Sequence, residues 1–299
     1  MIEDVLVTEA GSDPTAGFES RGTPELVELM NAADTAVPEA VGAAASAIAA
    51  AIDAIVERMR AGGRLVYVGA GSSGRIAALD ASECEATFAT RPGVVSALLA
   101  GGETASGLAQ ASAEDDRDAG AADIGAADIG AVDSVIGISA SGRTPYVLGA
   151  LEAAIERGAL SACVVSAPSS ELGALVEHEI AVVVGPEFLA GSTRLKAGTA
   201  QKLVLNTIST IAMIRLGKTY GNLMVDVVAA NEKLRNRVRR IVAAATGASP
   251  ERVDAAVAAA DGDARVAIVS LLAGVDAATA RTRLDESGRS IAAALESAS

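Results

Sequence analysis

The sequence is poor in aromatic residues, histidine and cysteine. Its 299 residues include no Trp, three Tyr, three Phe, two Cys and one His. A single histidine, His178, argues against a metal site built from histidine ligands, and its two glutamate neighbours favour a place at the surface. The cysteines Cys84 and Cys163 form no disulfide framework, which is typical of a protein from a reducing compartment.

Positive charge is also scarce. The chain has 24 Lys and Arg against 38 Asp and Glu, a formal net charge of −14. This balance argues against a nucleic-acid partner or an acidic membrane surface. The acidic N-terminus does not follow a signal-peptide pattern, and charged residues such as Asp53 and Arg215 interrupt the apolar windows. We therefore expect a cytoplasmic protein with no membrane partner, in which local donors hold any anionic ligand.

Hydrophobic residues make up 51% of the chain, and many of them are alanines, which favours closely packed helices. Between residues 65 and 184, short apolar runs alternate with helix-compatible segments. The runs show no inward and outward alternation, so they predict an α/β fold with a parallel sheet covered on both faces. The expected strands are 65–68, 94–100, 135–139, 162–166 and 180–184, and the expected helices between them are 76–84, 106–121, 145–157 and 170–177.

The rest of the chain is predicted to be helical. Thr23 followed by Pro24 fits a helix N-cap, and a long helix is expected from Pro38 to Arg60. A repeated AADIG at 121–130 is interpreted as a surface connection between elements. We expect an arm with a short helix over 1–35, an α/β domain over 36–220 and a helical domain over 221–299, with helices at 192–216, 231–246, 250–260, 263–273, 275–284 and 286–297.

Two strand ends lead into turns rich in glycine and serine, and both turns contain the letters SGR. Such turns let the backbone approach an anion, and the free N–H groups of a following helix point at it. The first turn, 69–74, fits the G-x-G-x-x-G pattern of dinucleotide sites, but no acidic residue ends the next strand. Paired hydroxyl groups favour a sugar phosphate instead. The candidate binding residues are Gly71, Ser72, Ser73, Ser139, Ser141, Gly142, Arg143 and Thr144.

Charged residues near these turns have two interpretations each. Glu83 could be a solvated helix end, although a carboxylate is unfavourable at the negative end of a helix dipole. Glu114 begins an acidic cluster that could simply be a solvated helix start. Arg194 and Lys196, at the start of the helix expected over 192–216, are interpreted as positive charge near a bound anion, with Lys196 as a ligand.

Three blocks of sequence resemble a known family. GAGSSGRIAALDASE, SASGRTPY and GPEFLAGSTRLKAGTAQKLVLN are similar to the N-acetylmuramic acid 6-phosphate etherases of bacterial cell-wall recycling. The run GNLMVDVVAANEKL continues the match, which covers the chain from about Ala36 to its end. The third block is shared with the glucokinase regulatory protein, a binding relative with two sugar isomerase (SIS) domains, whereas this chain has room for one.

The resemblance implies a three-layer SIS domain with a five-stranded parallel sheet, a helical tail and a homodimer. It implies an enzyme, a carbon–oxygen lyase, that cleaves the lactyl ether of N-acetylmuramic acid 6-phosphate into N-acetylglucosamine 6-phosphate and D-lactate. The family's two acidic catalytic residues correspond to Glu83 and Glu114. No metal and no cofactor are needed for this chemistry.

Two carboxyl groups suit the reaction. One carboxylate removes the acidified C2 proton of the open-chain sugar while a carboxylic acid protonates the departing lactyl oxygen, and water then adds at C3. We assign Glu83 as the acid, which requires a raised pKa and a partly buried site, and Glu114 as the base. Glu83 lies ten residues beyond Ser73, about 15 Å along an unbroken helix. We therefore expect either an early helix break or a site that Glu83 of a facing subunit completes.

The sequence departs from the family in two places. Glu85 and Ala86 stand where prolines are usual, and the arm before Leu26 keeps little of the family's pattern. A change in the arm could alter substrate preference. Two other functions stay open from sequence, namely a non-catalytic sensor of sugar phosphates and an aldose–ketose phosphosugar isomerase; a nicotinamide-dependent dehydrogenase ranks below both.

Overall fold

The computed structural model describes residues 17–102, 112–226 and 232–296. The chain divides into two compact units. The first comprises Met1–Ser82 and Gly93–Ser209, and the second comprises Glu83–Pro92 and Thr210–Ser299. The domain boundaries expected at residues 35 and 220 stay predictions.

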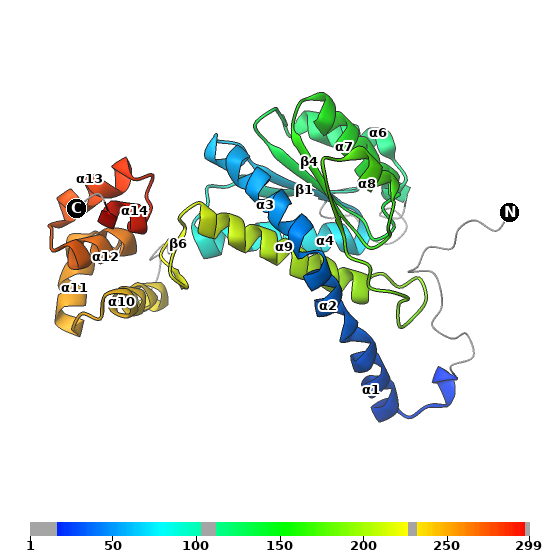
Figure 1. The fold of residues 1–299 in the computed structure, drawn as a ribbon, viewed down its shortest axis with the longest axis horizontal. Coiled ribbons are helices and arrows are strands. Elements are labelled where there is room, and N and C mark those ends of the chain that lie inside the picture. The colour runs from blue at the N-terminus through cyan, green and yellow to red at the C-terminus, as the bar shows by residue number, and fades with distance from the viewer. Residues whose placement is uncertain (1–16, 103–111, 227–231, 297–299) are drawn as a thin grey trace. The chain divides into compact units, whose positions relative to one another are not determined.

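The first unit is built on a five-stranded parallel sheet, as predicted (Figure 1). The strand order is β2-β1-β3-β4-β5, and every neighbouring pair is parallel. The order reverses after β1, since the chain passes first to β2 on one side and then to β3 on the other. The strands are β1 (Leu65–Gly69), β2 (Val95–Leu99), β3 (Ser134–Ile138), β4 (Leu160–Val165) and β5 (His178–Ala181).

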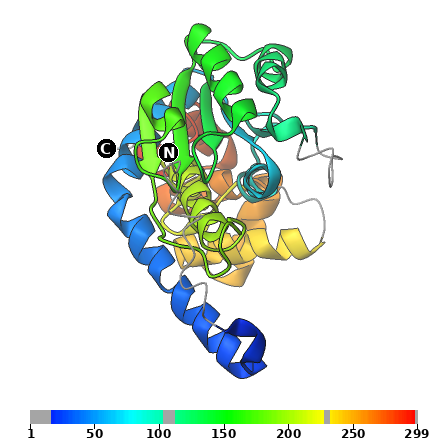
Figure 2. The same cartoon turned by 90° about the vertical axis from the view of Figure 1, so that its right-hand side faces the viewer.

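Helices cover both faces of this sheet and give three layers, which confirms the predicted architecture (Figures 1 and 2). Every residue of β1, β3 and β4 is buried, which explains why these strands show no polar alternation. One face carries α6 (Arg117–Ala126), α7 (Pro145–Glu156) and α8 (Glu171–Leu175). The other carries α3 (Ala45–Arg60), α4 (Gly71–Phe88) and the α9 helix (Lys196–Arg215).

A buried carboxylate joins β1, α4 and α9 on this second face. Asp80 of α4 accepts hydrogen bonds from the Tyr67 hydroxyl at 2.9 Å, the Asn206 amide at 2.6 Å and the Ser209 hydroxyl at 3.0 Å. Three donors compensate for the lost hydration of the buried carboxylate. The contact fixes where α4 lies on the sheet, and α4 begins at the first glycine-rich turn.

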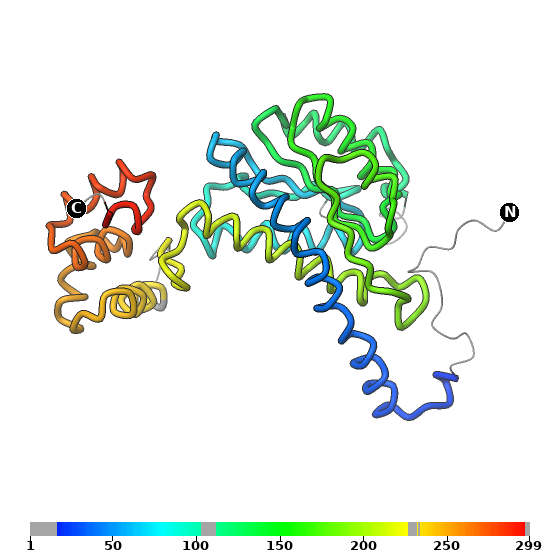
Figure 3. The backbone as a smooth tube through the Cα atoms, in the orientation of Figure 1, coloured from blue at the N-terminus to red at the C-terminus, as the bar shows by residue number. Residues whose placement is uncertain are grey.

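The N-terminal helices, drawn in blue in Figure 3, differ from the prediction. The long helix expected from Pro38 to Arg60 is two helices, α2 (Ala36–Ala43) and α3, separated at Ala44. A 3-10 turn, η1 (Phe18–Ser20), comes first in the described chain. The helix α1 (Thr23–Asp34) is capped by Gly22 rather than by Thr23, so Pro24 stands one residue deeper than predicted.

The AADIG repeat was predicted to be a surface connection, and this prediction is wrong. Its first copy belongs to α6, and Ile124 and Ile129 are buried in the core between α6, α7 and the sheet. Glycines outside the repeat allow α6 and α7 to pack closely. A Cβ on Gly120 would lie 2.0 Å from the Tyr146 carbonyl oxygen of α7, and one on Gly149 of α7 would lie 2.0 Å from the Arg117 oxygen.

The second unit is helical, as predicted, and has its own core. Its helices are α10 (Glu232–Thr246), α11 (Pro250–Ala259), α12 (Ala264–Ala273), α13 (Ala277–Glu286) and α14 (Ile291–Glu296), preceded by the short antiparallel pair β6 (Thr219–Tyr220) and β7 (Leu223–Met224). The buried Arg265 of α12 forms an ion pair with Asp226, which also binds Lys218 at 2.7 Å. These pairs hold the two ends of the hairpin against the helices.

Among the described residues, no single helix is long and apolar enough to cross a membrane. One bent pair, Thr23–Ala43 with Ala45–Arg60, meets the criteria of length and composition when both parts are taken together, with an angle of 55° between them. The apolar side chains of α3, including Ile48, Ile52 and Ile55, are buried in this structure.

Two glycine substitutions should have opposite effects on the free energy of unfolding, because one glycine lies in the close contact of α6 and α7 and the other faces open space. Gly149→Ala places a methyl group against backbone atoms that cannot yield, and it should lower the free energy of unfolding by about 1–3 kcal/mol. Gly42→Ala, in the exposed face of α2 where the new Cβ meets nothing within 4 Å, should raise it by about 0.5–1 kcal/mol. Urea denaturation of both variants tests this, and equal effects would contradict the packing.

Candidate functional site

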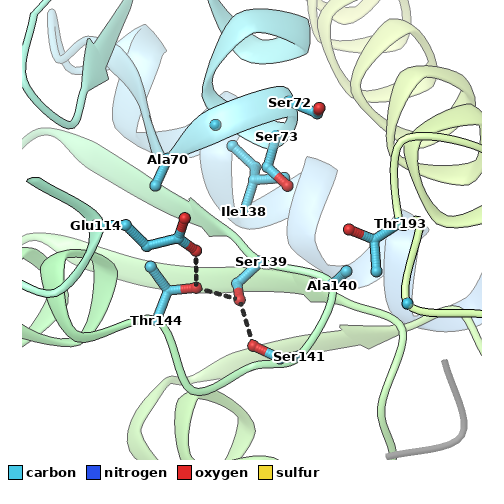
Figure 4. Close-up of a pocket in the computed structure, with 12 residues that line it drawn as sticks. Ala70, Ser72, Ser73, Glu114, Ile138, Ser139, Ala140, Ser141, Thr144 and Thr193 are labelled. Carbon is cyan, nitrogen blue, oxygen red and sulfur yellow. Dashed lines mark hydrogen bonds between the residues drawn. The ribbon is translucent and has the colours of Figure 1, made fainter. Parts of the chain in front are cut away.

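A cavity of about 360 Å³ lies where the strand order reverses, at the carboxyl ends of β1 and β3. Open parallel sheets bind their ligands at such a point, because the loops after the two strands diverge there. Its volume suits a small molecule. The lining residues come from the turns after β1 and β3, from the segment before α6 and from the loop before α9, and they are Ala70, Gly71, Ser72, Ser73, Glu114, Ile138, Ser139, Ala140, Ser141, Thr144, Gly191 and Thr193 (Figure 4).

The first wall is the start of α4. This helix begins directly after β1, and its first hydrogen bond runs from the Gly74 N–H to the Ala70 oxygen. The N–H groups of Gly71, Ser72 and Ser73 therefore have no partners within the helix, and these three residues line the cavity. The direct entry depends on two glycines in contact. A Cβ on Gly69 would lie 2.8 Å from the Gly74 Cα, and one on Gly74 would lie 2.2 Å from the Leu99 side chain. Ser72 and Ser73 add hydroxyl groups at this edge.

The second wall is the turn after β3, and its serines shape the backbone. The Ser139 hydroxyl accepts the Gly142 N–H at 3.0 Å, and the Ser141 hydroxyl accepts the Arg143 N–H at 3.3 Å. Gly142 has a φ of +67°, and a Cβ there would lie 2.3 Å from the Ser170 Cβ. The glycine is therefore required by both backbone conformation and packing.

Glu114 is the only ionisable side chain among the described residues that line the cavity. The Thr144 hydroxyl donates to it at 3.5 Å and contacts the Ser139 hydroxyl at 2.8 Å, and Ser139 lies 3.3 Å from Ser141 (Figure 4). Burial raises the pKa of Glu114 above the usual glutamate range, the charge of Asp115 raises it further, and the Thr144 hydrogen bond lowers it in part. A carboxylate of raised pKa is a stronger base.

The third wall, with Gly191 and Thr193, is held in place by a residue that the sequence analysis did not single out. Glu187 is fully buried, and its carboxylate accepts the N–H groups of Lys196 at 2.9 Å and Ala197 at 3.0 Å. It therefore caps the start of α9 from within the preceding loop. The only sequence feature that marked Glu187 was its place in the long third block.

The same loop carries an aromatic contact with the N-terminal segment. The ring of Phe188 stacks on Phe18 of η1, with 4.7 Å between the centroids and 13° between the planes. This contact joins the described end of the arm to the loop that forms the third wall. Residues 1–16, which include the first part of the stretch that departs from the family, lie outside the described residues.

The structure brings together most of the predicted binding residues, but four predicted site residues are not among the lining ones. Gly142 is buried behind its turn, and Arg143 is exposed. Lys196 is buried, and its ammonium group donates to the Val184 carbonyl at 2.8 Å. Glu83 is exposed on α4, which continues without a break to Phe88.

Within the described chain, no group of three or more His, Cys, Asp and Glu side chains is placed to hold a metal ion.

The strand order, the three layers and the site at the strand ends are those of a SIS domain. The family model of the glucokinase regulatory protein N-terminal SIS domain matches residues 47–155. The phosphoheptose isomerase of Francisella tularensis has a similar fold, with a TM-score of 0.51 and 21% identity over 64% of this chain and 97% of that one.

Much closer relatives cover nearly the whole chain. An N-acetylmuramic acid 6-phosphate etherase of Rubrobacter xylanophilus is 57% identical over 93% of both chains. One of Streptomyces avermitilis is 54% identical over 99% of this chain and 95% of its own. The chain belongs to the N-acetylmuramic acid 6-phosphate etherase family, which confirms the resemblance found in the sequence.

The cap at the start of α9 predicts a graded loss of stability. Glu187→Ala leaves two buried N–H groups without an acceptor and should lower the free energy of unfolding by about 1–3 kcal/mol. Glu187→Gln keeps one oxygen as an acceptor and should cost less. The control Glu39→Ala, an exposed first-turn glutamate of α2, should change it by less than about 0.5 kcal/mol. Equal losses in Glu187→Ala and the control, by urea denaturation, would contradict the cap.

Proposed function

We propose that the chain is a carbon–oxygen lyase that cleaves the C3 lactyl ether of N-acetylmuramic acid 6-phosphate, giving N-acetylglucosamine 6-phosphate and D-lactate. The main support for this proposal is the lining of the cavity. An anion cradle and a carboxylate of raised pKa line the same cavity, in a chain that is 57% identical to an etherase with this substrate in its name.

The substrate phosphate is expected to bind between the start of α4 and the turn after β3. The backbone N–H groups of Gly71, Ser72 and Ser73 and the hydroxyl groups of Ser139 and Ser141 are the donors at this place. No lysine or arginine occurs among the described lining residues, so N–H groups, hydroxyl groups and the dipole of α4 hold the charge.

The reaction is an elimination followed by addition of water. Glu114 removes the C2 proton of the open-chain sugar, and the electron pair forms the C2–C3 double bond as the C3–oxygen bond breaks. Glu83 protonates the lactyl oxygen, which leaves as D-lactate. Water then adds to the unsaturated aldehyde at C3. Burial of Glu114 supports its role as the base, because a raised pKa brings a carboxylate closer to the basicity that proton abstraction needs.

Glu83 is best explained by a site that two subunits share. An early end of α4 would have brought it nearer the cradle of its own chain, but α4 is continuous from Gly71 to Phe88. Glu83 therefore lies ten residues beyond Ser73, about 15 Å along the axis. Its exposure in a single chain is compatible with service to a second copy. We assign it to the cavity of the partner in a homodimer.

Lactate release tests the reaction and both glutamates. The wild type should release D-lactate from N-acetylmuramic acid 6-phosphate, whereas Glu83→Gln and Glu114→Gln should each lose about 10²–10⁴-fold in rate, because each removes a group that moves a proton. The control Glu85→Gln changes an exposed carboxylate on the same helix and should keep the rate. A wild-type protein that binds the sugar phosphate without releasing lactate would contradict the etherase assignment and favour a sensor of sugar phosphates.

Mixing the two inactive variants tests the shared site. In a mixed dimer one cavity has Glu114 from one chain and Glu83 from the other, so random exchange at equal amounts should restore about a quarter of the wild-type rate. No restoration in dimers shown to have exchanged subunits would exclude the shared site and leave the lactate result untouched.

The pH profile tests Glu114 as the base. A base must be ionised, so kcat/KM should fall as the pH drops through the pKa of Glu114, which lies above the usual glutamate range. Asp115→Asn removes a like charge, lowers that pKa and should move the acidic limb to lower pH. High salt should shrink this difference, because Asp115 is exposed. Asp118→Asn is the control, and an unmoved limb in Asp115→Asn would contradict the assignment.

A further inference from the structure

The hydroxyl group of Thr144 is used in an unusual way. Thr144 is the N-cap of α7, a position where a threonine hydroxyl ordinarily accepts an N–H of the first turn. Here the side chain makes no cap hydrogen bond. It is buried, and it contacts the Ser139 hydroxyl at 2.8 Å and the Glu114 carboxylate at 3.5 Å instead. The hydroxyl is thus available to the site rather than to the helix.

Each hydroxyl group has one proton, which fixes the directions of the hydrogen bonds when Glu114 is ionised. Thr144 then donates to Glu114, so Ser139 must donate to Thr144, and the contact of Ser139 with Ser141 needs the proton of Ser141. The backbone N–H groups of Gly142 and Arg143 already donate to the two serines and cannot reverse. All three hydroxyl protons therefore point along the chain toward Glu114.

A bound phosphate competes for the same hydroxyl donors. A phosphate dianion only accepts hydrogen bonds, so in this cradle the hydroxyl groups of Ser139 and Ser141 donate to it. Once Ser139 donates to the phosphate, its contact with Thr144 can be kept only if Thr144 donates to Ser139. Thr144 then has no proton left for Glu114. The two arrangements exclude each other.

We propose that Thr144 is a positioning residue that couples the phosphate cradle to the base. When a bound phosphate accepts the hydrogen bonds of the two serine hydroxyl groups, the Thr144 hydroxyl donates to Ser139 instead of Glu114. Without this hydrogen bond, Glu114 becomes a stronger base. The inference rests on the proposed function, since it requires a phosphate ester in this cavity. Its consequence is that a bound phosphate prepares proton abstraction before the sugar reacts.

Direct repulsion between the phosphate and Glu114 acts in the same direction and must be separated from the coupling. Within one chain, the charged groups that bear on Glu114 are Asp115 on its own segment and the phosphate itself, because the start of α4, the turn after β3 and the described lining of the loop before α9 present no ionisable side chain to the cavity. The proposed function adds Glu83 of the partner subunit, which is the same in the wild type and in every Thr144 variant. Repulsion needs no hydroxyl at position 144. Thr144→Val keeps the shape and the repulsion and removes only the coupling.

The test compares the acidic limbs of kcat and kcat/KM, which report the complex and the free enzyme respectively. In the wild type the limb of kcat should lie at higher pH than that of kcat/KM. Thr144→Val removes the donor to Glu114 from the free enzyme, so its kcat/KM limb should move to higher pH and the gap should narrow. Thr144→Ser should restore the wild-type gap. An unchanged gap in Thr144→Val would overturn the coupling.

A binding measurement separates this inference from the etherase reaction. Calorimetry with inorganic phosphate in buffers of different ionisation enthalpy gives the protons taken up on binding. The number of protons taken up should be larger in the wild type and Thr144→Ser than in Thr144→Val. Thermal unfolding should show one cooperative transition for each of the three proteins, because the substitutions remove no cap hydrogen bond from α7. Binding with equal uptake overturns the coupling alone. Absence of phosphate binding to the wild type overturns the cradle and the coupling together.

Discussion

The contact between Gly69 and Gly74 is the constraint on which the site depends. Because neither residue has a side chain, the first turn of α4 lies directly against the end of β1. The unpaired N–H groups of that turn are thereby aimed at the carboxyl edge of the sheet. A larger residue at either position would push the helix away, and the turn after β3 would then face no second wall. The reversal of strand order between β1 and β3 supplies the space, and the glycines supply the donors.

The site combines groups of two kinds with little charge between them. Fixed N–H groups and hydroxyl groups form one side, and the half-buried carboxylate of Glu114 forms the other. Thr144 and Ser139 connect the two sides through hydrogen bonds. A chain of hydroxyl groups can change the direction of its protons without moving heavy atoms, so it suits communication over a short distance inside a packed wall.

The sheet and the helical second unit could be predicted because β1 to β4 are short, mostly apolar runs, and because a glycine follows each of the helices α10, α11, α12 and α13 within about three residues. The two serine turns could also be predicted, since glycine and serine residues directly after a buried parallel strand are typical of anion-binding turns. Lys196 could not be placed, because its ammonium group meets a carbonyl whose position depends on the loop that Glu187 holds. The AADIG repeat was misjudged because alanine and glycine are common both in surface turns and in close helix contacts, and only the burial of Ile124 and Ile129 distinguishes the two.

A chain of net charge −14 repels every anion around it, and the described lining of its cavity contains no cation that would offset the repulsion. General attraction therefore cannot fill this cavity, and a ligand stays only if it satisfies several fixed donors at once. Among the many anions of a cell, such a protein discriminates by the arrangement of oxygen atoms rather than by the amount of charge.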